Sequence, residues 1–276
     1  MKAKQIFTLL SASFAAVLVL ISACVQAAET PADVFVYSRV SVADAAGQSV
    51  QGISVDGFRG AGERDIVVPG QIEGLPVLKI GYRAFNESYI LNTVVLPEGL
   101  LEIEPYAFHE CEFLRDINIP STVIRIGMSA FDECKQVRAF TIPKGLTVLE
   151  PEVFSDCDSL GAIDIPAGVT RIERKAFDGC NALRSVTIPA GVTFIGDSAF
   201  EGCKSLHEVV IPEGVTELGR SAFEECHSLR TIDIPASVAN IGYEAFDECY
   251  RLTIVGRPGS YAETYARQNG LKFAAK

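Results

Sequence analysis

The sequence predicts a β-rich solenoid of the α/β type, built from 23-residue coils stacked in one elongated domain. From residue 97 onward, proline, phenylalanine and cysteine each recur at this interval without an insertion, as in Pro189, Phe200 and Cys203. Three residue types in one phase cannot arise from composition. A fixed period of about 20 to 50 residues is the signature of a solenoid, in which each unit buries its apolar side against its neighbours.

Each coil is expected to contain one short strand. The unit is clearest over residues 188–210, which read IPAGVTFIGDSAFEGCKSLHEVV. Residues 184–188 alternate and end at Pro189, which lacks the amide needed to continue a strand. Ile195 and Phe200 then point inward from an irregular or single-turn helical back side. Strands of successive coils should form a parallel, concave face, and the phenylalanine rings should stack roughly 4.5 to 7 Å apart.

The repeat defines the domain organisation. Residues 66–256 form a solenoid of eight coils, of which the first is irregular. Residues 24–65 lack the repeat and contain a linker and a β-hairpin that turns at residues 45–48. Residues 257–276 contain a turn, a helix over 261–269 stopped by Gly270, and a last strand over 271–273. Both flanking segments are interpreted as caps, because an open solenoid end would expose its core and a strand edge.

Residues 1–23 are expected to be an export signal, with Lys2 and Lys4 before a short apolar run. A membrane-spanning helix is the less favoured alternative, since no basic stop-transfer segment follows. Residues 21–24 read Ile-Ser-Ala-Cys, similar to the lipobox at which bacterial lipoproteins are lipidated, which predicts a lipid on Cys24. Ordinary cleavage before Ala28 is the alternative. We therefore expect an outer-membrane or cell-surface lipoprotein, or alternatively a periplasmic or secreted protein.

The charge balance argues against several partners. The formal net charge is −11, and no basic run interrupts it. Phosphate backbones and anionic lipid surfaces attract positive charge, so nucleic acid is excluded as a partner, and contact with a membrane is expected only through the lipid anchor.

The cysteines and histidines do not form a recognisable catalytic or metal site. The seven repeat cysteines lack C-x-x-C pairs, and parallel ladder side chains stay too far apart for a disulfide, which predicts buried free thiols. His109, His207 and His227 fall in different phases of the repeat. Carboxylates that follow the phenylalanines, such as Asp132 and Asp178, are expected to form a solvated acidic edge rather than a calcium site. The sequence thus predicts no catalytic residue, no metal ligand and no cofactor.

The outward positions of the strand face are the candidate binding residues. They vary in chemical type from coil to coil, while their inward neighbours stay apolar. The candidate set is Arg115, Asn118, Arg138, Thr141, Asp164, Arg184, Thr187, Glu208, Val210, Arg230 and Asp233.

The phrase I-P-x-G-V-T-x-I-G-x-x-A-F-x-x-C resembles the BspA-like leucine-rich repeats of bacterial surface proteins. The resemblance covers about residues 66–256, and residues 259–263 also resemble the usual ending of that family. It implies a non-catalytic module for protein binding or adhesion, with a host matrix protein or a bacterial surface protein as partner. The alternative is a structural envelope protein without a specific ligand, and an enzyme is the least favoured reading.

Overall fold

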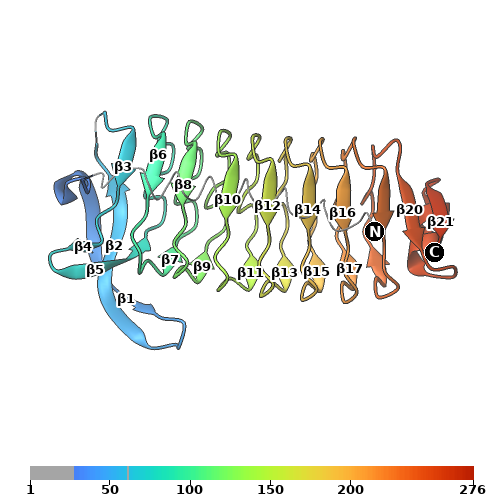
Figure 1. The fold of residues 1–276 in the computed structure, drawn as a ribbon, viewed down its shortest axis with the longest axis horizontal. Helices are drawn as coiled ribbons and strands as arrows, with labels where there is room; N and C mark the ends of the chain where they lie inside the picture. Colours follow the sequence, from blue (N-terminus) through green and yellow to red (C-terminus); the bar gives the residue numbers. More distant parts are fainter. Residues whose placement is uncertain (1–27, 61) are drawn as a thin grey trace, which may run out of the picture.

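The computed structural model describes residues 28–60 and 62–276, and it shows a row of coils stacked along one axis (Figure 1). We name each coil after its phenylalanine, from the Phe85 coil to the Phe246 coil. Every coil contributes one strand to a first ladder, as predicted. The strands of this ladder are β3 (Asp65–Val67), β6 (Thr93–Val95), β8 (Asp116–Asn118), β10 (Ala139–Thr141), β12 (Ala162–Asp164), β14 (Ser185–Thr187), β16 (Glu208–Val210), β18 (Thr231–Asp233) and β20 (Thr253–Gly256).

A second parallel ladder runs along the opposite edge of the coils, where the sequence predicted irregular chain or a single helical turn. Its strands after the first coil are two residues long: β7 (Glu102–Ile103), β9 (Arg125–Ile126), β11 (Val148–Leu149), β13 (Arg171–Ile172), β15 (Phe194–Ile195), β17 (Glu217–Leu218) and β19 (Asn240–Ile241). In the first coil, β5 (Leu75–Ile80) is longer and also pairs with β4 (Gln71–Ile72). Two residues are too few to show alternation, which is why sequence reasoning missed these strands.

The phenylalanines form the predicted spine. Consecutive rings from Phe85 to Phe246 lie 5.0–5.8 Å apart and within 15° of parallel. All eight are buried. Offset stacking of this kind stabilises aromatic pairs beyond their burial alone.

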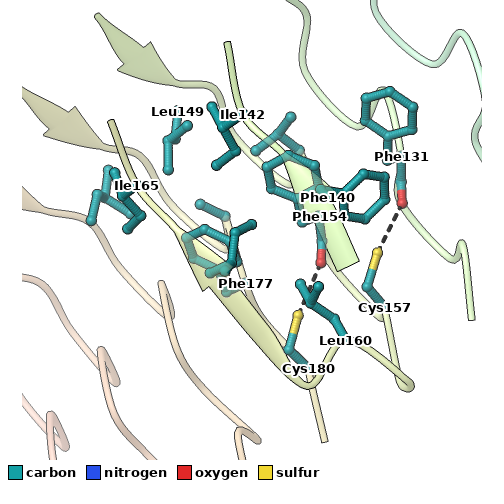
Figure 2. Close-up of a cluster of buried hydrophobic side chains, with 14 of the residues drawn as sticks. Phe131, Phe140, Ile142, Leu149, Phe154, Cys157, Leu160, Ile165, Phe177 and Cys180 are labelled. Atoms are coloured by element: carbon teal, nitrogen blue, oxygen red, sulfur yellow. Dashed lines mark hydrogen bonds between the residues drawn. The ribbon is translucent and has the colours of Figure 1, made fainter. Parts of the chain in front are cut away.

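The repeat cysteines are free and buried, and each has a defined hydrogen-bond partner. The thiol of Cys157 donates to the carbonyl oxygen of Phe131, and that of Cys180 to Phe154, at 3.3 and 3.2 Å (Figure 2). All seven thiols repeat this contact with the phenylalanine of the preceding coil. Burial raises the pKa of the Cys111 thiol to about 12. The cysteine column is therefore part of the core.

Both ladders are interrupted at the same place. Among the described residues, no backbone hydrogen bond joins β8 to β10 or β9 to β11, although the back-side bond from Phe131 N to Val153 O remains, at 3.1 Å. The coil after the break carries Phe140 at an inward strand position where its neighbours carry isoleucine or valine. The Phe140 ring lies 5.0 and 4.7 Å from Phe131 and Phe154. We attribute the break to the volume of this extra ring.

The N-terminal cap begins with a short 3₁₀ helix, η1 (Ala32–Val34). The predicted hairpin is formed by β1 (Phe35–Ala43) and β2 (Ser49–Phe58), and β2 pairs in parallel with β5. Phe35 and Phe58 extend the phenylalanine spine, with rings 5.6 Å apart and Phe58 5.9 Å from Phe85. The hairpin thus covers the first coil and the edge of the second ladder.

The C-terminal cap consists of α2 (Tyr261–Gln268) and β21 (Lys272–Ala275). The Ser260 side chain accepts a hydrogen bond from Glu263 N at the start of α2, as an N-cap should. Tyr265 packs edge-on against Phe246, with ring centroids 6.0 Å apart, and so closes the spine. Strand β21 pairs with β20 and closes the edge of the first ladder.

Candidate functional site

The candidate residues lie on the outward side of the first ladder, which we call the strand face. The pairing registers place Thr141, Asp164, Thr187, Val210 and Asp233 side by side on adjacent strands. All the candidate residues are exposed or half-buried, while the residues between them, such as Ile163 and Val186, are buried. A continuous outward row results because strand side chains alternate between the two faces.

Three candidate residues already have partners within the chain. The Asn118 side chain accepts from Leu96 N at 2.7 Å and donates to Leu96 O at 3.0 Å, so it extends the ladder at the edge of the break. Asp233 pairs with Lys276 at 2.6 Å, and Arg115 donates to Gln136 at 3.0 Å. The remaining candidates on the strand face are freer to contact a partner.

The predicted arginines lie where the chain enters the first ladder, one residue before each strand. Arg184, Arg230 and the histidine of the coil between them, His207, line a hollow of about 570 Å³. Sequence reasoning did not place His227 and Arg251 in the candidate set, although both line the same hollow. His227 and Arg251 occupy different positions of the 23-residue repeat, so the repeat pattern alone does not predict that they lie together.

The prediction of a solvated acidic edge is wrong for several of its carboxylates, which are less exposed than expected. Asp132 and Asp178 are half-buried, with side chains 15% and 18% exposed. Burial raises the pKa of Asp132 to about 6, and it also raises the pKa of Asp156 and of Asp178. The backbone turns that follow each phenylalanine bring these carboxylates against the coil. The sequence showed that acidic residues recur at one position of the repeat but not how the turn orients them.

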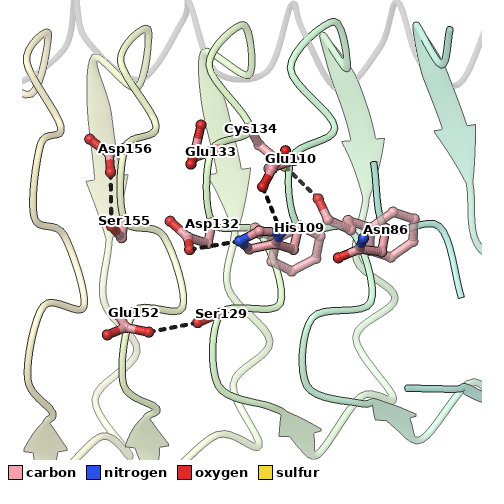
Figure 3. Close-up of polar contacts among 12 residues, drawn as sticks. Asn86, His109, Glu110, Ser129, Asp132, Glu133, Cys134, Glu152, Ser155 and Asp156 are labelled. Atoms are coloured by element: carbon pink, nitrogen blue, oxygen red, sulfur yellow. Dashed lines mark hydrogen bonds and ion pairs between the residues drawn. The ribbon is translucent and has the colours of Figure 1, made fainter. Parts of the chain in front are cut away.

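The prediction that the three histidines lie apart is wrong for two of them, because His207 and His227 line the same hollow, and the third, His109, has acidic partners of its own. His109 Nε2 lies 3.3 Å from Asp132 Oδ2, and its Nδ1 lies 3.6 Å from Glu110 Oε1 (Figure 3). His109, Glu110 and Glu133 present donor atoms within 4.8 Å of one another, a spacing at which a metal ion could be held. Each carboxylate has a partner: Tyr89 donates to Glu110 at 2.7 Å, and Lys135 pairs with Glu133 at 2.9 Å. We interpret the group as a network of hydrogen bonds and polar contacts at the coil edge.

The predictions about export and membrane attachment concern parts of the chain other than the strand face. The export signal and Cys24 lie in residues 1–27, outside the described part of the chain. Within residues 28–60 and 62–276, no helix has the length and apolar character needed to span a membrane.

The repeat matches a known protein family. The BspA type leucine rich repeat region matches residues 53–184 and 170–266, in six copies. The chain belongs to the BspA-type leucine-rich repeat family. It is 30% identical to a leucine-rich repeat protein of T. pallidum whose crystal structure superposes with a TM-score of 0.63, over 89% of this chain and 98% of that one. No curated protein matches the chain.

Two further solved structures share the fold. A leucine-rich repeat protein from Bacteroides ovatus ATCC 8483 is 23% identical over 90% of this chain and 76% of its own, with a TM-score of 0.51. One from Eubacterium ventriosum ATCC 27560 is 20% identical over 80% of this chain and 71% of its own, with a TM-score of 0.50. At these identities the likeness concerns the fold alone.

Proposed function

We propose that this BspA-type protein is a non-catalytic binding module that uses its strand face to hold a protein partner outside the cytoplasm. The observation that carries the proposal is the exposed row from Thr141 to Asp233, where outward side chains vary over an invariantly apolar core. Stacked short strands give an extended surface, and such surfaces are the usual binding sites of solenoid proteins. Mixed charge on the face, as in Arg184 and Asp164, favours a polar protein partner.

The partner is proposed to be a host matrix protein or a bacterial surface protein. Immobilised residues 28–276 should retain a specific protein from panels of both kinds, and retention should weaken as salt is raised. The alternative, a structural envelope protein, predicts that neither panel yields a partner whose retention depends on strand-face residues.

Export and anchoring are a second part of the proposal, supported by the lipobox-like residues before Cys24. If Cys24 carries the lipid, the protein should fractionate with membranes, and Cys24→Ala should release it or leave it uncleaved. Protease treatment of intact cells should then digest the repeats if they face outward. An unmodified N-terminus at Ala28, seen by mass spectrometry, would establish ordinary cleavage and a periplasmic or secreted protein.

A further inference from the structure

The hollow of about 570 Å³ lies at the edge of the strand face where the chain enters each strand, and we call it the strand-edge hollow. It is lined by basic and hydroxyl side chains. Arg184, Arg230 and Arg251 reach it from three different coils, together with His207 and His227. Ser205 and Ser228 add two hydroxyl groups. Among the described residues no carboxylate lines it, and the nearest acidic contact is that of His227 with Glu248, at 3.5 Å, whereas acidic residues outnumber lysine and arginine by 35 to 24 in the whole chain. The hollow is therefore a local positive site on an acidic protein.

The three arginines form no ion pair with any described residue, unlike the arginines of the second ladder. Arg125 pairs with Glu102 at 2.9 Å, and Arg171 pairs with Glu173 at 2.7 Å. An arginine without an internal partner keeps all its guanidinium donors for a ligand, in a planar fork that matches a carboxylate or another oxyanion.

A second hollow, of about 440 Å³, differs from the first because its positive side chains are balanced by carboxylates. It lies on the back of the coils, and its cations Arg174, Lys175 and Arg220 share it with four carboxylates. Arg220 faces Glu244 at 3.9 Å within it. Because the arginines of the strand-edge hollow lack such carboxylates, we infer that they are available to bind an anionic group of another molecule.

We propose that the strand-edge hollow binds an acidic peptide segment of the protein partner, with the partner's carboxylates held by Arg184 and Arg230. This inference rests on the proposed function and specifies its partner chemistry. Arg184 and Arg230 are two coils apart, roughly 10 Å at the usual strand spacing, so a segment with two or more acidic side chains can engage both.

A peptide fits the surroundings better than an anionic polysaccharide does. Strand β16, which follows His207, exposes Val210 to 55% on the strand face beside Thr187. A peptide can cover this valine with an apolar side chain while its acidic side chains enter the hollow. A sulfated sugar chain could supply the anions but offers little to cover the valine.

The test uses the domain spanning residues 28–276 and a fluorescent hexaglutamate peptide, with hexaglutamine as the uncharged comparison. Binding is measured by anisotropy at about 0.1 M salt, where screening within about 10 Å limits repulsion from distant acidic residues. The test variant is Arg184→Gln/Arg230→Gln. The matched control, Arg257→Gln/Arg267→Gln, removes the same charge from two exposed residues of the C-terminal cap. Circular dichroism and thermal melting check that all three proteins are folded.

We expect hexaglutamate, but not hexaglutamine, to bind the unchanged domain, the test variant to bind at least tenfold more weakly, and the control to change less than twofold. Equal binding by the test variant and the unchanged domain, or no binding of hexaglutamate, would overturn the proposal. Binding of heparin but not of hexaglutamate would also overturn it, in favour of a polysaccharide. If a protein partner from the panels binds the strand face but is insensitive to Arg184→Gln/Arg230→Gln, this inference fails while the proposed function stands.

Discussion

The thiol of Cys157 donates a hydrogen bond to the carbonyl oxygen of Phe131, one coil earlier, over 3.3 Å. That oxygen also accepts from Cys134 N at 3.3 Å, so the phenylalanine and cysteine columns are joined coil by coil. Cysteine suits the position because it is small, tolerates burial and donates weakly.

The seven repeat cysteines should not react with thiol reagents in the folded protein. Burial raises the pKa of the repeat thiols, to about 12 for Cys111, and the thiolate is the reactive form. Titration of residues 28–276 with a thiol reagent should find almost no reaction before unfolding and seven reactive thiols in denaturant. Native disulfides between coils, detected by mass spectrometry, would contradict the assignment.

The phenylalanine spine should dominate the stability of the middle coils. Phe177 is fully buried, with neighbouring rings at 5.6 and 5.2 Å. Phe177→Ala should lower the free energy of unfolding by about 3 to 5 kcal/mol, the usual cost of emptying such a site. Asp164→Ala, on the exposed strand face, should cost less than about 0.5 kcal/mol. Similar losses in urea melts for the two variants would mean that the inward and outward faces are misassigned.

Asp132 should make the protein more stable in mild acid than at neutral pH. Its pKa is about 6 when folded, against about 3.9 for an ordinary aspartate in an unfolded chain. A carboxyl whose folded pKa is raised contributes stability that is complete below about pH 4 and is lost as the pH rises through about 6. This group should therefore make the free energy of unfolding about 1 kcal/mol larger at pH 5 than at pH 7.5.

The substitution Asp132→Asn isolates this contribution. Asn keeps the shape of the side chain beside His109 but does not titrate. The difference between the unfolding free energies at pH 5 and pH 7.5 should shrink by about 1 kcal/mol in this variant. It should stay unchanged in Asp164→Asn, which alters an exposed carboxylate. An unaltered difference in Asp132→Asn would show that burial does not raise the pKa of this carboxyl in the folded protein.

The break beside Phe140 should be visible in amide exchange. Thr170 N donates to Thr147 O, and Glu173 N donates to Leu149 O, but no described residue accepts from the corresponding amides of Thr147 and Glu150 in the preceding coil. Thr147 and Glu150 should therefore exchange their amide hydrogens faster than Thr170 and Glu173. Phe140→Ile should slow their exchange toward that of the neighbouring coils. Equal protection in the unchanged protein would contradict the break.

The repeat predicted the features that depend on phase alone. Phe177 and Cys180 recur in columns whose burial follows from stacking, and the strand over Ser185–Thr187 follows from alternation before Pro189. Features that depend on chain path or volume could not be predicted. Phe140 is larger than the isoleucine or valine at the same position of the other coils. The sequence alone does not show how large a side chain can be at this position before the ladder hydrogen bonds are lost.

The candidate site was predictable in part. Arg184 and Arg230 were identified because they share one phase of the repeat. Arg251 comes from another phase and joins them only because the turn before β20 folds toward the same hollow. In the same way, the half-burial of Asp132 reflects the tight turn after Phe131, which charge patterning alone does not show.

The most direct test of the account is the dissociation constant of a partner retained by the domain, measured against two charge-reversal variants. Arg184→Glu/Asp164→Lys changes the strand face, and Arg220→Glu/Glu224→Lys makes the same exchange of charge on the back of the coils. Binding through the strand face predicts at least tenfold weaker binding for the first variant and less than twofold change for the second. Loss of binding in the back variant, with the strand-face variant unaffected, would contradict the account.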